Sequence, residues 1–171
     1  MQYTTVLPLG GKGWGIGWYS FSIMNNSFFE PPALLHFSFW WSEVRLIVAA
    51  ITLFVGASPL IYIILPIPFL YGIIGLLLKL AWIISGLTAA YLGYRWYIGG
   101  EKLFGGVDLY DRLAFAVMVI SGLNLGIAGI LNINIGMSIS TNYILFVLMG
   151  VAYLWSAYRL YSRRSAGPFI S

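Results

Sequence analysis

Four long apolar stretches, none of which contains an acidic residue, set the strongest constraint on how this chain folds. They cover residues 44–65, 69–98, 112–131 and 142–161. A hydrocarbon core about 30 Å thick needs about 20 apolar residues per helix, and each stretch reaches that length. Only 8% of the 171 residues are charged, whereas soluble domains carry roughly a quarter. We therefore expect an all-α integral membrane protein with about four transmembrane helices in a bundle.

Prolines mark the boundary between the first two stretches. Pro59 interrupts the stretch over 44–65, which predicts a kink or a break after Gly56. Two more prolines precede the next stretch and predict a tight apolar turn. The stretch over 69–98 is about 30 residues, or roughly 45 Å of helix, which exceeds the hydrocarbon thickness. We expect it to tilt, to kink or to project from the membrane.

The N-terminal segment, residues 1–42, differs from the rest in composition. Glycines alternate with larger residues over positions 10–18, and many aromatic residues follow. These glycines lack the strand, the Lys-Ser/Thr ending and the helix of a phosphate-binding loop. Pro31 and Pro32 predict the end of this segment. We interpret it as an irregular interfacial segment, with a docking arm for partner proteins as the alternative, and residues 43–171 as the helical bundle.

The basic residues predict the orientation of the helices. In a four-helix topology, eight of the nine fall on one side of the membrane: Lys12, Arg45, Arg95, Lys102, Arg112, Arg159, Arg163 and Arg164. The two connections on the other side carry no charge. By the positive-inside rule, both termini are expected on the cytoplasmic or a topologically equivalent side. An odd number of spans would scatter the basic residues over both sides.

Small residues recur on one face of the second and the third predicted helices. Both helices contain Ile-Ser-Gly-Leu, at 84–87 and at 120–123. Small residues then follow at spacings of three or four, namely Gly86, Ala90 and Gly93 in the second helix and Gly122, Gly126 and Gly129 in the third. Such faces let two backbones approach closely in lipid. We predict helix packing through these residues, and we favour convergent packing grooves over a duplicated unit.

Two polar side chains inside the predicted spans are candidate functional residues. Lys79 falls near the middle of the helix over 69–98, where a charge costs on the order of 3 kcal/mol and marks a functional site by default. No acidic residue in any span is available to pair with it, so a structural role is favoured, with the side chain reaching the interface. Asn124 is predicted to form an interhelical hydrogen bond, worth roughly 0.6 kcal/mol.

Residues that carry chemistry are scarce in this chain. It has no cysteine and one histidine, His36, which excludes disulfides and thiolate metal sites and leaves too few ligands for a metal. The sequence contains no nucleophile–base pair and no Gly-x-Ser-x-Gly motif. A run of four basic residues, as a nucleic-acid patch would need, is also missing. We therefore expect no catalytic residue, no metal, no cofactor and no nucleic-acid partner.

The C-terminal half carries a family resemblance. Its matching segments are Asp111-Arg112-Leu113-Ala114, Leu123 to Gly129, and Phe146 to Ala152 around Gly150. With these segments, residues 110–160 resemble a small two-helix membrane family without assigned activity, domain of unknown function 378. Leu125 stands where that family has tryptophan, and Asn134 where it has aspartate. The resemblance implies a helical hairpin and brings no enzyme activity with it.

These observations favour a non-catalytic structural or scaffolding subunit of a larger membrane-embedded assembly. Its expected partners are the lipid bilayer and other membrane subunits, contacted through residues 1–42 and the small-residue helix faces. The assembly could be a membrane protein complex, such as an energy-converting or secretion complex, or the inner membrane of a virion. One alternative is a small channel or carrier that uses Lys79. Another is a subunit whose aromatic residues line a haem, quinone or pigment.

Overall fold

Four long helices dominate the computed structural model, which describes residues 31–164 and 169–170. They are α1 (Pro31–Phe54), α3 (Tyr71–Ile98), α4 (Leu109–Leu131) and α6 (Tyr143–Ser162). Three short helical segments lie in the connections: α2 (Leu60–Ile64), the 3₁₀ turn η1 (Pro68–Leu70) and α5 (Ile135–Ile139). Each long helix is long and apolar enough to cross a membrane. The predicted all-α architecture with four such helices is therefore confirmed.

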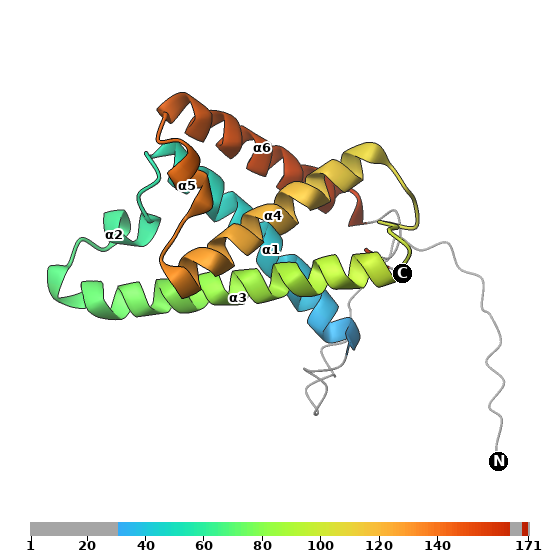
Figure 1. Ribbon diagram of the computed structural model, residues 1–171, viewed down its shortest axis with the longest axis horizontal. Helices are drawn as coiled ribbons and strands as arrows, with labels where there is room; N and C mark the ends of the chain where they lie inside the picture. The colour runs from blue at the N-terminus through green and yellow to red at the C-terminus, as the bar shows by residue number, and fades with distance from the viewer. Residues whose placement is uncertain (1–30, 165–168, 171) are drawn as a thin grey trace, which may run out of the picture.

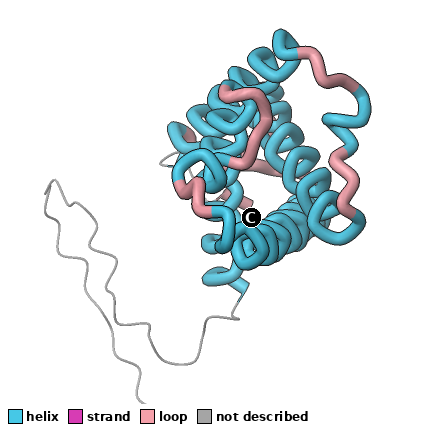
Figure 2. The backbone as a smooth tube through the Cα atoms, turned by 90° about the vertical axis from the view of Figure 1, so that its left-hand side faces the viewer, coloured by secondary structure: helices cyan, strands magenta, loops and turns pink. Residues whose placement is uncertain are grey.

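The four long helices pack around one core (Figure 1). α1 and α4 each contact the three other long helices, while α3 and α6 lie on opposite sides of the bundle (Figure 1). Figure 2 looks along the horizontal axis of Figure 1 and shows α3 nearly end-on. Each long helix contributes a fully buried side chain to the core, namely Leu46, Leu92, Met118 and Leu160.

The first helix lies earlier in the chain than the sequence predicts. The stretch over 44–65 was expected to be helical, but α1 begins at Pro31 and takes in residues assigned to the N-terminal segment. Proline is tolerated in the first turn of a helix, because the N–H that it lacks would have no partner there and its φ is already helical. Pro31 and Pro32 therefore start the helix instead of closing the segment. Residues 1–30 of that segment lie outside the described part of the chain.

The end of α1 agrees with the predicted break. The helix stops at Phe54, and Gly56 and Ala57 follow with left-handed φ values of 87° and 62°. A left-handed glycine just past the last turn is a common helix terminator. Pro59 then precedes the separate short helix α2. The bounds of α3, α4 and α6 lie within three residues of those predicted.

The N-terminal turns of the long helix α3 project beyond its neighbour α4, while its expected tilt, kink or projection from a membrane stays a prediction. An ideal Cβ on Gly129 would lie 3.0 Å from the backbone oxygen of Lys79, and Gly129 is only two residues from the end of α4. The turns of α3 before Lys79 therefore extend past α4. Tyr62 of α2 packs against this extension, with its ring 5.1 Å from that of Tyr71.

α3 and α4 approach each other closely along several of the small residues that the sequence singles out. An ideal Cβ on Gly86 would lie 2.6 Å from Cα of Gly126, and one on Gly126 would lie 2.7 Å from Cα of Gly86. Gly122 likewise leaves no room for a Cβ, which would fall 2.5 Å from that of Ala89. Ala90, predicted on this face, is instead exposed. Ala89 and Ala90, three and four residues after Gly86, both lie near the face of Gly86 on the helix. The angle at which α3 crosses α4 places Ala89, and not Ala90, in the contact.

Replacement of Gly126 by alanine tests this contact. The added methyl must push the two backbones apart, because its nearest neighbour is a backbone atom. We expect the free energy of unfolding to fall by about 1–3 kcal/mol. Gly72→Ala is the matched control, since nothing lies within 4 Å of its ideal Cβ. Thermal unfolding in detergent, followed by circular dichroism, measures both, and equal midpoints for the two variants would contradict the contact.

Candidate functional site

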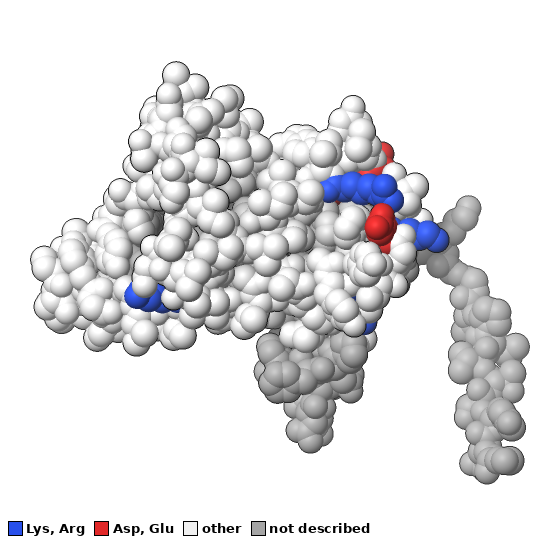
Figure 3. Space-filling model, in the orientation of Figure 1, with Lys and Arg blue, Asp and Glu red and all other residues white. Residues whose placement is uncertain are grey.

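Charged side chains gather at one end of the bundle, where α4 begins and α6 ends (Figure 3). Each of the four acidic residues in the described part of the chain pairs with an arginine there: Asp108 and Asp111 with Arg159, Asp111 also with Arg163, Glu43 with Arg164, and Glu101 with Arg112. The pair between Glu43 and Arg164 joins the middle of α1 to the chain just after α6. At the opposite end of the bundle, the hydroxyl of Tyr143 at the start of α6 donates to the carbonyl of Phe54, the last residue of α1, at 3.0 Å. The start of α1 and the end of α6 therefore lie toward the same end of the bundle.

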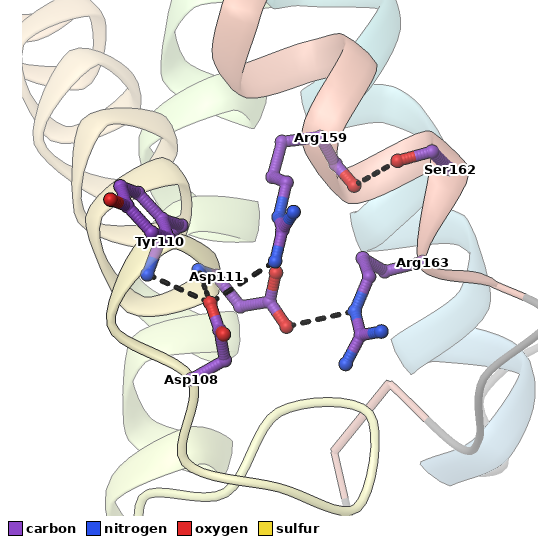
Figure 4. Close-up of polar contacts among 6 residues, drawn as sticks. All are labelled: Asp108, Tyr110, Asp111, Arg159, Ser162 and Arg163. Carbon is purple, nitrogen blue, oxygen red and sulfur yellow. Dashed lines mark hydrogen bonds and ion pairs between the residues drawn. The ribbon is translucent and has the colours of Figure 1, made fainter.

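Asp111 is the centre of this charged end. Its side chain is fully buried, yet both of its carboxylate oxygens are occupied. Arg159 Nε donates to Oδ1 at 2.6 Å, and Arg163 Nε donates to Oδ2 at 3.0 Å (Figure 4). Charge-assisted hydrogen bonds of this kind are about twice as strong as neutral ones. The start of α4 is thereby joined to the last turn of α6.

Asp108 caps the N-terminus of α4. Its Oδ1 accepts from the backbone N–H groups of Tyr110 and Asp111 at 2.9 and 3.1 Å. The pKa of the Asp108 carboxyl is lowered, chiefly by the hydrogen bond from the N–H of Asp111. The N–H of Tyr110 and the positive charges of Arg159 and Arg163 lower it further. Since Arg159 also donates to Asp108 at 3.1 Å, this carboxylate stabilises the helix start and is not a free acid or base.

The structure places Arg45 inside the bundle, which the sequence analysis did not anticipate. Arg45 was expected at the membrane surface, at the very start of the first helix, but it lies past the middle of α1 and is buried. Its Nη1 donates to Ser121 Oγ at 2.9 Å, and its Nη2 donates to the Met118 carbonyl at 2.7 Å. Met118 and Ser121 lie near the middle of α4. The guanidinium is therefore at mid-depth in the bundle.

The surroundings of Arg45 are polar but uncharged. Ser38 and Ser42 precede it on the same face of α1 and are also buried, and this spacing is the sequence signal that could have revealed the site. The two hydroxyls and Arg45 Nε have no hydrogen-bond partner among the described residues. An ideal Cβ on Gly122 would lie 3.1 Å from Arg45 Nη2, so this glycine also makes room for the guanidinium. Such a charge, held by neutral acceptors, can attract an anion or bind helices together.

Lys79 and Asn124, the two candidates from the sequence, lie elsewhere. Lys79 is exposed on the outside of α3 and lies toward the end of the bundle opposite the charged cluster. Asn124 donates to Asn134 Oδ1 at 3.0 Å and accepts from the N–H of Ile135 at 2.9 Å. Its hydrogen bonds therefore reach the short helix α5 and not another long helix. Of the small-residue positions, Gly93 also differs, because its ideal Cβ has only Val119 Cγ1 nearby, at 3.6 Å.

Two grooves open on the outside of the bundle near its charged end. The groove between α1 and α6 has a volume of about 500 Å³ and is lined by Glu43, Ile47, Leu154, Ala157, Tyr158 and Tyr161. The groove between α3 and α4 has a volume of about 260 Å³. Groups of three or more metal-ligating side chains are not found in the described part of the chain.

Comparison of the chain with protein families, with characterised proteins and with solved structures finds no match. The resemblance of residues 110–160 to the two-helix membrane family stays a prediction. The segments that carry it fall on α4 and α6, which pack against each other.

Asp111→Asn tests the role of the buried carboxylate. The change leaves Arg159 and Arg163 facing a neutral amide, so we expect the free energy of unfolding to fall. Breaking a buried pair costs about 3–5 kcal/mol, and we expect the lower end because both arginines are partly exposed. Asp108→Asn is the control, since asparagine caps a helix as well as aspartate does. A loss of stability in the control as large as that in Asp111→Asn would contradict this role.

Arg45→Met and Arg45→Ala separate two roles of the buried arginine. Methionine fills most of the space, and Ser121 keeps its hydrogen bond to the Met118 carbonyl, at 3.0 Å. Since an apolar side chain can replace a buried charge with little loss, we expect Arg45→Met to unfold within about 1 kcal/mol of the parent. Arg45→Ala leaves a cavity and is expected to cost about 2–3 kcal/mol. Chemical unfolding in detergent measures both, and an equal loss in the two variants would show that the charge itself stabilises the bundle.

Proposed function

We propose that the chain is a non-catalytic structural subunit of a larger membrane-embedded assembly. Its four long helices span the bilayer, with both termini on the cytoplasmic or a topologically equivalent side. The gathering of arginines at the end that holds the start of α1 and the end of α6 supports this orientation. The exposed apolar surface of all four helices supports lipid as the surrounding solvent.

Glu43 is the observation that carries the proposal. Its Oε2 accepts from Arg164, but its Oε1 is buried and has no hydrogen-bond partner among the described residues. A buried polar atom without a partner costs about 1–3 kcal/mol, and more for a charged group. Glu43 lines the groove between α1 and α6, whose other walls are apolar or aromatic. A helix of another subunit that lies over this groove would insert a hydroxyl, amide or basic side chain, which would donate to Oε1.

We favour the groove over the small-residue faces, one of the two surfaces that the sequence suggested for partner binding; most of the other, residues 1–42, lies outside the described part of the chain. Gly86, Gly122, Gly126 and Gly129 face the contact between α3 and α4, so these positions are not available to another subunit. The groove between α1 and α6 is open, and its lining is apolar or aromatic except for Glu43, whose Oε1 needs a hydrogen-bond donor. Such a combination is typical of helix association in lipid, where hydrogen bonds across the interface add specificity.

A carrier that uses Lys79 has weaker support. Lys79 is on the outside of α3, level with the end of α4, where its long side chain can reach the interface. Its position therefore has a structural explanation.

Site-specific photo-crosslinking in native membranes tests the proposal. A photoreactive residue in place of Tyr158, in the groove, is expected to crosslink to another subunit. The same residue in place of Tyr94, which is exposed on α3, is the control. Glu43→Ala should abolish the crosslink from position 158, whereas Glu101→Ala, which removes an acidic residue outside the groove, should leave it unchanged. A chain that yields no crosslink at either position and purifies alone in mild detergent would contradict the proposal.

A further inference from the structure

Gly93 is the one glycine of the predicted packing face that does not bring two backbones together. An ideal Cβ on Gly86 or Gly126 would lie less than 3 Å from a backbone atom of the other helix, but one on Gly93 meets only Val119 Cγ1, at 3.6 Å. α3 and α4 therefore separate toward their charged end. The missing side chain leaves open the groove of about 260 Å³ between them.

This groove has an apolar part and a polar part, arranged along the axis of the bundle. Phe115, Ala116 and Val119 form apolar walls next to Gly93. Trp96 and Arg112 lie at its other part, nearer the charged end. Tryptophan is enriched at the level of lipid headgroups, so the polar part lies where a headgroup would be and the apolar part lies deeper.

The polar part contains two buried donors without partners in the described part of the chain, and the acidic residue nearest to it, Glu101, does not line the groove. Arg112 Nη2 is 3.4 Å from the Glu101 carbonyl and 3.9 Å from Glu101 Oε2, so both contacts are long. Arg112 Nε and the indole N–H of Trp96 have no hydrogen-bond partner among the described residues. None of the residues that line the groove is acidic. A guanidinium held this loosely can turn to bind a phosphate, for which its planar fork of N–H groups is well suited.

We propose that this groove binds an anionic glycerophospholipid, with the phosphate at Arg112 and an acyl chain along Gly93, Ala116 and Val119. Basic pockets between transmembrane helices on the cytoplasmic side suit anionic headgroups. The size of the groove also favours lipid over protein, because a helix is about 10 Å across and would not enter a space this small. The lipid is held on the face of the bundle that α3 and α4 form, away from the groove that contains Glu43.

Native mass spectrometry of the purified full-length chain in detergent tests the site, with dioleoyl phosphatidylglycerol and dioleoyl phosphatidylcholine as the probes. Arg112→Gln is expected to weaken binding of phosphatidylglycerol about fivefold, and to weaken binding of phosphatidylcholine less, because its choline ammonium already balances the phosphate charge. Arg112→Lys should keep most of the preference for the anionic lipid. Gly93→Leu should weaken binding of both lipids at least as much, because its side chain fills the groove. Its Cβ makes only an ordinary contact, so the fold is expected to tolerate the change.

Two control variants separate the site from general effects of charge and bulk. Lys102→Gln removes a basic residue of the charged end that does not line the groove, and Gly72→Leu adds the same side chain at an open position of α3. Both should bind phosphatidylglycerol like the parent. Equal affinity of the parent for the two lipids would overturn the proposal, as would unchanged binding in Gly93→Leu. Loss of a co-purifying subunit in Gly93→Leu, with lipid binding intact, would assign the groove to a protein instead.

Discussion

The close approach of α3 and α4 is the contact on which the rest of this bundle depends. Gly86 and Gly126 bring the two backbones together, and in the proposed lipid environment, which supplies no hydrophobic driving force between helices, association would rely on such packing and on hydrogen bonds. The same face of α4 serves a second helix, because Gly122 makes room both for Ala89 of α3 and for the Arg45 guanidinium of α1. One row of glycines thus sets the spacing of three helices. A side chain at Gly122 would disturb both contacts at once.

Hydrogen bonding explains how so many arginines fit into a bundle that is otherwise apolar. Arg159 and Arg163 neutralise a buried aspartate at the end of the bundle. Arg45 lies at mid-depth and uses only neutral acceptors, Ser121 and the Met118 carbonyl. Arg112, by contrast, makes two long contacts. Arg159 and Arg163 are therefore held by ion pairs, and Arg45 is held by hydrogen bonds to neutral acceptors. Arg112, with only long contacts, is the arginine best able to bind the phosphate of the proposed lipid.

Hydropathy and small-residue spacing predicted most of the fold from the sequence, and the failures have physical causes. The bounds of α3, α4 and α6 follow from apolar length, but a pair of prolines is compatible with either the end of a segment or the first turn of a helix. Because the first helix was predicted to begin near residue 44 and not at Pro31, Arg45 was assigned to the membrane surface, and the buried site was missed. Ala90 was predicted on the packing face where the structure has Ala89, because the angle at which α3 crosses α4 cannot be derived from a single sequence. The two grooves could not be predicted, because they arise from how far neighbouring helices separate.

The two grooves have opposite chemical requirements, and they face different sides of the bundle. Between α1 and α6, Glu43 presents a buried acceptor that requires a donor, which a protein side chain can supply. Between α3 and α4, Arg112 and Trp96 present donors that suit an anion. Since α3 and α6 lie on opposite sides (Figure 1), both grooves can be filled at the same time without steric conflict. A structural subunit of this design would contact another subunit on one face and hold a lipid on the other, and its charged end would set the depth of both.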